Sequence, residues 1–128
     1  MYKKKIYDIN IVTERLKKYC SLQDRCQWDI TKKMNQWGLL KKTQNHILDN
    51  LIAQRYIDEE RYAKSFCRGK FRIKKWGKMK IINELKQKNI SKEFIKTGLK
   101  EIEEFHYINT LENLLKTKKN GLKDVNNF

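Results

Sequence analysis

The chain has 128 residues, enough for one ordinary domain or for two to three short helical repeats. Its 30 lysines and arginines stand against 15 aspartates and glutamates, and the formal net charge of +15 repels itself unless a nucleic acid, an anionic protein groove or an anionic membrane neutralises it. Three Trp, six Tyr and five Phe indicate packed cores and exclude a disordered basic tail.

Helix breakers are nearly missing from the sequence. It contains no proline and five glycines, while lysine, leucine, isoleucine, glutamate and glutamine are abundant. No apolar run approaches the roughly 20 residues of a membrane-spanning helix, and the start of the chain lacks the apolar stretch of a signal peptide. We therefore expect an all-α, cytoplasmic protein that does not enter a membrane.

Patterns typical of catalytic and metal sites are also missing. Cys20, Cys26 and Cys67 match no paired metal spacing, and His46 and His106 have no partner three or four residues away. We interpret the thiols as buried or idle in a reducing compartment, and we expect no metal and no cofactor. No nucleophile, base and orienting acid can be assembled with any specificity, so we expect a binding protein and not an enzyme.

Apolar residues at helical spacing predict three helices in the first half of the chain. After a polar opening, a first helix begins near Ile11. Ser21 is expected to cap a second helix, which ends at Gly38. Thr43 is expected to cap a third helix, which ends near Ile57.

The fourth helix has the clearest start in the sequence. Asp58 begins it, and two glutamates follow in its first turn, where the helix dipole favours negative charge. We expect Tyr62, Phe66 and Ile73 to share its apolar face, and Trp76-Gly77 to end it.

Three more helices are predicted in the rest of the chain. A fifth ends at Lys88-Asn89, because asparagine tolerates the left-handed conformation that terminates helices. Ser91 caps a sixth, in which Gly98 is expected to allow a close helix approach. A seventh covers about Phe105 to Lys118, and beyond Asn120-Gly121 the pattern dissolves.

The apolar pattern repeats along the chain. A shift of 51 residues places Ile30 on Ile81, and a shift of 48 places Ile47 on Ile95. We therefore expect tandem three-helix repeats that stack into an elongated, curved body, with a third repeat that is incomplete. The expected parts are a polar segment, a first repeat, a second repeat, and the first helix of a third with a disordered tail, at residues 1–10, 11–57, 58–103 and 104–128.

Positive charge concentrates between Arg61 and Lys88, where eleven lysines and arginines stand against one glutamate. Lys64, Arg68 and Arg72 form a stripe at helical spacing, and like charges so placed destabilise a helix unless an anion is bound. Phosphates are the simplest anion, and a solvated lysine-rich face is the alternative. The expected contact residues are Arg61, Lys64, Arg68, Arg72, Lys74, Lys75, Lys78, Lys80, Lys86 and Lys88.

Three tryptophans are candidates for stacking against nucleic-acid bases. Trp28 lies at an apolar-periodic position, which favours packing in a core. Trp37 and Trp76 each precede a glycine at a helix end, where a packing anchor and a partner contact are equally good interpretations.

The segment from Tyr56 onward carries a recognisable pattern: a hydrophobic pair, Asp-Glu-x-Arg-Tyr-Ala, a basic helix, a glycine, and Leu-x-x-Lys-Asn-Ile. It resembles the signature of the RecX family of recombinase regulators, over roughly Cys20 to Lys119. Two features depart from that family: Asn89 stands where a glycine is usual, and the third repeat stops after its first helix. The positions that match the family pattern, or that we assign to structure, are Ser21, Gly38, Asp58, Tyr62, Ala63, Phe66, Trp76, Gly77, Leu85 and Ile90.

The resemblance implies a protein of tandem three-helix repeats that lies in the groove of the RecA filament on DNA. It would restrain filament growth, ATP hydrolysis and strand exchange in recombination, DNA repair and the SOS response. It would act as a monomer, with weak and sequence-nonspecific binding to single- or double-stranded DNA. A plain DNA- or RNA-binding helical protein is the alternative, because a three-helix unit also resembles a helix-turn-helix module.

Overall fold

Six helices follow one another in the computed structural model, which describes residues 8–126, with the side chains of residues 107, 110 and 117–126 outside the description. They are α1 (Ile9–Leu22), α2 (Gln27–Gln36), α3 (Lys41–Ala53), α4 (Glu59–Arg72), α5 (Lys78–Gln87) and α6 (Lys92–Asn126). The all-α fold is confirmed, and none of these helices is long and apolar enough to cross a membrane.

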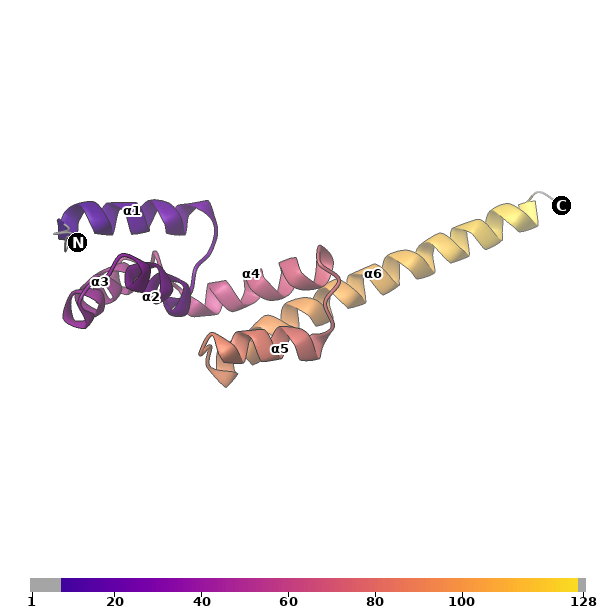
Figure 1. The fold of residues 1–128 in the computed structure, drawn as a ribbon. Helices are drawn as coiled ribbons and strands as arrows, with labels where there is room; N and C mark the ends of the chain where they lie inside the picture. Colours follow the sequence, from indigo (N-terminus) through magenta and orange to yellow (C-terminus); the bar gives the residue numbers. More distant parts are fainter. Residues whose placement is uncertain (1–7, 127–128) are drawn as a thin grey trace.

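The helices form two units with separate hydrophobic cores. In Figure 1, α1 to α3 gather at the N-terminal end, α4 and α5 lie beside the first part of α6, and the rest of α6 extends away. The first core consists of Val12, Leu16, Cys20, Ile30, Met34, Ile47, Leu51 and Ile57. The second core consists of Cys26, Tyr62, Ala63, Cys67, Ile81, Leu85, Ile90, Ile95 and Ile102. The elongated arrangement agrees with stacked repeats, while the domain limits inferred from the sequence stay predictions.

The helices of the two units correspond in length and in position along the chain. The helices α1 and α4 have 14 residues each, and α2 and α5 have 10 residues each. The starts of α2 and α5, at Gln27 and Lys78, are 51 residues apart, as are those of α3 and α6. Ile30 and Ile81, paired by this shift, are both fully buried.

The shift of 48 residues proposed for the third helix is wrong by about one helical turn. A constant shift of 51 places Leu51 on Ile102, and both side chains are buried. It also places Gly38 on Asn89, which end α2 and α5 with positive φ angles of 71° and 59°. Asn89 thus adopts the left-handed conformation that the sequence predicted.

Two predicted helix caps are wrong. Ser21 lies inside α1, where its Oγ donates to the carbonyl oxygen of Lys17 at 2.9 Å. Cys26 is the N-cap of α2, because the Asp29 carboxylate accepts its backbone N–H at 3.2 Å. Thr43 lies inside α3, which begins at Lys41. By contrast, the Asp58 carboxylate accepts the N–H of Arg61 at 2.9 Å and confirms the predicted start of α4.

The end of α4 comes earlier than the sequence predicted. The helix stops at Arg72, and Lys75, with φ of 59°, turns the chain before Gly77 caps α5. Ile73 does not join the core, since its side chain is 78% exposed. Tyr62, Ala63 and Cys67 of α4 enter the core, whereas Ile73 is the C-cap residue and lies beyond the part of the helix that the core covers.

The predicted sixth and seventh helices are one helix, α6, of 35 residues. Neither proline nor glycine occurs between Gly98 and Gly121, so nothing interrupts the backbone hydrogen bonds. The helix also runs past Asn120-Gly121 to Asn126, where we expected a disordered tail; residues 127 and 128 lie outside the described part. Four apolar residues of the extension are exposed, namely Ile108, Leu111, Leu114 and Leu115.

Gly98 brings α6 against α4, as the sequence predicted. A Cβ atom at this position would lie 2.8 Å from the carbonyl oxygen of Ala63 and 2.9 Å from Sγ of Cys67. These distances are shorter than van der Waals contact, and the carbonyl belongs to a helical backbone that cannot move aside alone. Only glycine therefore permits this separation of the two helices.

Replacing Gly98 tests this contact. We expect Gly98→Ala to lower the free energy of unfolding by about 1–3 kcal/mol, because α4 and α6 must separate. Gly69→Ala is the matched control: Gly69 lies within α4 with no atom within 4 Å of an added Cβ. This control should raise the free energy of unfolding by about 1 kcal/mol, because alanine has a higher helix propensity than glycine. Urea denaturation followed by circular dichroism measures both, and a Gly98→Ala protein as stable as the parent would contradict the interpretation.

Candidate partner-binding surface

Arg61, one of the expected contact residues, joins the two units instead of standing free. Its Nε donates to Oδ1 of Asp24 at 2.8 Å, and its Nη2 donates to the carbonyl oxygens of Arg55 at 3.2 Å and Tyr56 at 3.4 Å. Asp24 belongs to the connection between α1 and α2, so this guanidinium ties that connection to the start of α4. Its positive charge thus stabilises the contact between the two units.

Lys88 also joins the two units. We call the region where the units meet, around Asp24, Cys26, Asp29, Arg61 and Lys88, the junction. Nζ of Lys88 lies 2.9 Å from the hydroxyl of Tyr62 and 3.5 Å from Oδ1 of Asp29. The Lys88 and Asp29 side chains are only 20% and 15% exposed, so little water screens this pair. The pair connects α2 of the first unit to the end of α5 in the second.

Two further contacts complete the junction. Cys26, at the start of α2, is fully buried in the core of the second unit. The neighbouring backbone N–H of Gln27 donates to Oε2 of Glu59 at 3.0 Å. Burial raises the pKa of Glu59 above its ordinary value, while this hydrogen bond acts in the opposite direction. The two units are therefore connected by the buried side chain of Cys26, with the charged contacts of Glu59, Arg61 and Lys88 around it.

The expectation that Trp28 packs in a core is wrong. Its side chain is 37% exposed, with Nζ of Lys32 5.1 Å and Nζ of Lys88 5.5 Å from its ring centroid. It lies at the second position of α2, next to the junction, where the second unit leaves its ring partly open. Trp37 and Trp76, by contrast, pack against the first and second cores.

Three more expected contact residues have carboxylate partners. Nζ of Lys64 lies 3.7 Å from Oε1 of Glu60, and Nη1 of Arg68 lies 3.3 Å from Oε1 of Glu101. Nζ of Lys78 lies 3.9 Å from Oε1 of Glu103. The pairs of Lys64 and Lys78 are exposed and that of Arg68 is partly exposed, so each adds little stability and can reopen to a partner. The pairing still lowers the local positive charge along the predicted stripe of α4.

The remaining expected contact residues have no carboxylate within 4.0 Å among the side chains that the structure describes; they are Arg72, Lys74, Lys75, Lys80 and Lys86. All except Lys86 lie around the loop that joins α4 to α5. Lys70, a cation in the last turn of α4 that we left out of the predicted contacts, belongs to the same group. We call Lys70, Arg72, Lys74, Lys75 and Lys80 the basic surface.

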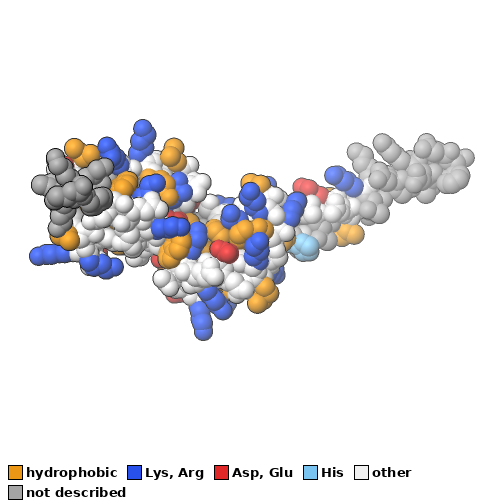
Figure 2. Space-filling view, viewed as in Figure 1, with side chains coloured by type: hydrophobic (Ala, Val, Ile, Leu, Met, Phe, Trp, Pro, Cys, Tyr) orange, Lys and Arg blue, Asp and Glu red, His pale blue; other side chains and the backbone are white. Residues whose placement is uncertain are grey.

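Aromatic rings order this basic surface. Nζ of Lys80 lies 4.2 Å and Nζ of Lys70 lies 4.8 Å from the centroid of Trp76, while the guanidinium of Arg72 lies 4.6 Å from that of Phe105. Such contacts hold long side chains in place while leaving their charge for a partner. Figure 2 shows lysine and arginine side chains gathered with apolar ones over this part of the molecule.

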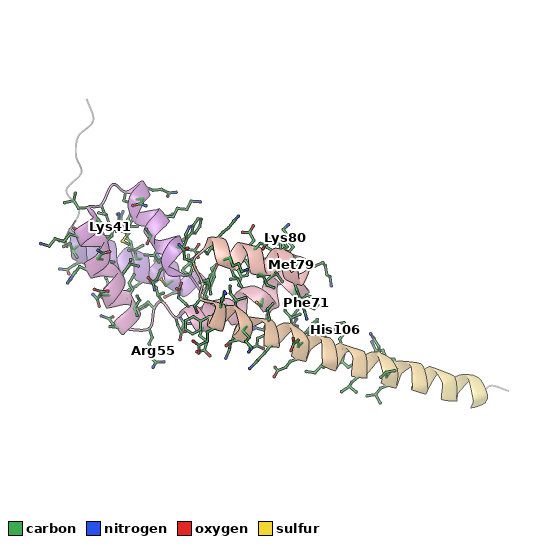
Figure 3. The ribbon with its side chains drawn as sticks, turned by 90° about the horizontal axis from the view of Figure 1, so that it is seen from below. Lys41, Arg55, Phe71, Met79, Lys80 and His106 are labelled. Atoms are coloured by element: carbon green, nitrogen blue, oxygen red, sulfur yellow. The ribbon has the colours of Figure 1, made fainter. Side chains whose placement is uncertain are left out.

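The middle of α6 contributes to this surface, which sequence reasoning missed. Phe71 of α4 contacts Phe105 of α6 edge to face, with centroids 6.1 Å apart. A groove of about 230 Å³ is lined by these rings together with Lys75, Trp76 and His106. Figure 3 shows the labelled Phe71, Met79, Lys80 and His106 at the same end of the second unit. The signal was a lone aromatic residue, Phe105, beyond the predicted end of the sixth helix.

The three thiols lie apart from this surface and are buried. Burial raises the pKa of Cys26 and that of Cys67 to about 11, and it also raises the pKa of Cys20. The reactive thiolate is therefore scarce near neutral pH. Among the described side chains, no group of three or more His, Cys, Asp or Glu is placed to hold a metal ion.

Thiol labelling checks the burial of the cysteines. We expect Ellman's reagent at pH 8 to modify all three cysteines slowly in the folded protein and at once in denaturant, because both access and the thiolate form are suppressed. Rapid modification of Cys26 or Cys67 without denaturant would show that the second core opens readily.

Removing the Lys88 ammonium tests the junction. Lys88→Met should lower the free energy of unfolding by about 1–3 kcal/mol, because it leaves the half-buried Asp29 carboxylate without its charged partner. Urea denaturation measures the change, and a double-mutant cycle with Asp29→Asn isolates the pair. Glu14→Gln, which breaks the exposed pair with Lys17, is the control and should change stability little. Equal effects of the two variants would argue against the junction.

Comparisons with known proteins agree on one family. A model of RecX, second three-helix domain, matches residues 58–99, which hold α4, α5 and the start of α6. Regulatory protein RecX of Lactobacillus johnsonii is 28% identical over 90 residues, covering 70% of this chain and 33% of that protein. Regulatory protein RecX of Prosthecochloris aestuarii is 25% identical over 83 residues, covering 65% of this chain and 55% of that protein.

A solved structure gives the same answer for the fold. The crystal structure of a regulatory protein RecX superimposes with a TM-score of 0.66 at 29% sequence identity, covering 73% of this chain and 47% of that one. The chain thus spans between a third and about half of the length of these relatives. Sequence pattern, family model and solved structure agree that the chain is similar to the RecX family of regulatory proteins, with residues 58–99 matching its second three-helix domain.

Proposed function

We propose that this protein regulates the RecA recombinase by binding the filament that RecA forms on DNA. It restrains filament growth, ATP hydrolysis and strand exchange, and so acts in recombination, DNA repair and the SOS response. It works as a cytoplasmic monomer through binding alone, without catalysis. Similarity to the RecX family supports the proposal, since the relatives are regulatory proteins.

The basic surface is the observation that carries the proposal. Five cations, none with a described carboxylate partner, lie around one loop of the second unit. Concentrated charge of this kind is stabilised by a polyanion, through release of counterions. A filament groove that contains DNA between acidic protein walls provides such an environment.

The shape of the chain also suits a groove. The two units lie in line, and α6, whose 35 residues make it about 50 Å long, extends that line (Figure 1). An elongated body can contact several subunits of a filament at once, and contacts with several subunits add to one another.

Binding to naked nucleic acid is the second candidate function. The net charge of +15 favours it, because phosphate contacts need no particular sequence. Tight, salt-sensitive binding to DNA with no effect on RecA would favour this function over regulation of the filament.

Charge reversal on the basic surface tests the proposal. The wild-type protein should slow the DNA-dependent ATPase of RecA at low salt, and Lys74→Glu with Lys75→Glu should require about tenfold more protein for the same inhibition. The matched control is Lys41→Glu with Lys42→Glu, the same change on exposed lysines of α3, and Figure 3 shows Lys41 at the other end of the molecule. Equal loss in both variants would mean that net charge alone matters, and no inhibition by wild type would refute the proposal.

A further inference from the structure

Two grooves border the outer face of α4 and share the residues Ser65, Gly69 and Ile73. The first, of about 340 Å³, lies between α4 and the connection from α1 to α2. The second, of about 550 Å³, lies between α4 and α6 at Phe105. Ile73 is 78% exposed at the end of this face, where its aliphatic side chain borders both grooves.

Cations line both sides of this face. Lys70 and Lys74 line the first groove, and Arg68 and Arg72 line the second. Of these four, Arg68 alone has a carboxylate partner among the described side chains.

The acidic residues of the first groove do not offset this charge. The carboxylates of Asp24 and Asp29 are already paired with Arg61 and Lys88 at the junction. The outer face of α4 therefore offers positive charge on both sides of an exposed aliphatic group.

This combination fits a protein better than a nucleic acid. A phosphate backbone would pair with the cations but would leave Ile73 without an apolar neighbour. A base would have to displace Arg72 from Phe105 or Lys70 from Phe66 before it could stack, because these cations already lie 4.6 Å and 5.4 Å from the ring centroids. A protein segment with carboxylates and an apolar side chain satisfies both kinds of group.

Gly69 supports a close approach from outside. It lies in the interior of α4, where glycine destabilises a helix relative to alanine. No positive φ requires it, and nothing lies within 4 Å of an added Cβ, in contrast to Gly98, which contacts α4. The missing side chain leaves a depression on the helix surface beside Ile73, open to a partner.

We propose that the outer face of α4 docks an acidic segment of a partner protein, with carboxylates on Arg72 and Lys74 and an apolar side chain against Ile73 above Gly69. The docking site rests on the proposed function in that it uses the same end of the second unit. It deepens that function by assigning this contact to the protein part of the filament, while DNA phosphates contact other cations of the basic surface.

Three probes of similar negative charge distinguish the partners: a labelled peptide of alternating glutamate and leucine, a glutamate-only peptide, and oligothymidylate. Fluorescence anisotropy with the full chain should show the glutamate-leucine peptide binding about tenfold more tightly than the glutamate-only peptide, because an apolar side chain is buried. Ile73→Ser and Gly69→Gln should remove this advantage and leave oligothymidylate binding unchanged. Thermal unfolding confirms that both variants fold, as expected for open positions.

The control variant is Ile11→Ser, which removes a 56% exposed aliphatic group from α1 and should change none of the three affinities. Equal affinity for the two peptides, or no binding of either, would overturn the docking site. So would a loss of oligothymidylate binding in Ile73→Ser as large as the loss for the peptide, which would make the face a nucleic-acid contact. Because RecA is absent from this titration, its outcome is separate from that of the ATPase assay.

Discussion

The close contact of α4 and α6 at Gly98 determines how the second unit is built. With no side chain between them, the backbone of α6 lies against Ala63 and Cys67, and the helices run together up to the contact of Phe71 with Phe105. The repeat shift of 51 residues places Ile47 of the first unit where the second has Gly98, so α1 and α3 have a large buried side chain at this point. The same three-helix plan therefore gives two different packings, and the tighter one carries the basic surface.

The lysines and arginines of the second unit divide into groups with different physical roles. Arg61 and Lys88 neutralise the partly buried carboxylates of Asp24 and Asp29 and hold the two units together. Lys64, Arg68 and Lys78 form exposed pairs, which stabilise little and reopen easily. The cations around the loop from α4 to α5 have no described acid beside them, and three of them, Lys70, Arg72 and Lys80, lie over aromatic rings. The formal net charge counts all three groups alike, so it does not show this division.

Local signals in the sequence predicted the features that depend on neighbouring residues. The capping carboxylate of Asp58, the left-handed Asn89 and the close approach at Gly98 all follow from residue type and position. The caps assigned to Ser21 and Thr43 were wrong because a hydroxyl inside a helix can donate to a carbonyl four residues earlier, as that of Ser21 does. A serine or threonine therefore marks the start of a helix only where no helical turn precedes it.

Features that depend on distant residues were out of reach of sequence reasoning. Arg61 and Lys88 meet carboxylates that are 37 and 59 residues away along the chain, so their roles at the junction have no local signature. The contribution of Phe105 to the basic surface depends on α6 continuing past the sixth predicted helix. A break was expected there because a third repeat was expected to begin, but a helix ends only where its hydrogen bonds are interrupted or capped.

The continuity of α6 has a mechanical consequence. Because one helix forms part of the core of the second unit and then leaves it, its far half moves with that unit as a lever whose base is held at Gly98 and Ile102. The extension beyond Phe105 is about 30 Å long, so a tilt of about 10° at its base displaces its end sideways by about 5 Å. A small change in how the second unit sits on a surface thus becomes a larger sideways displacement at the far end of α6.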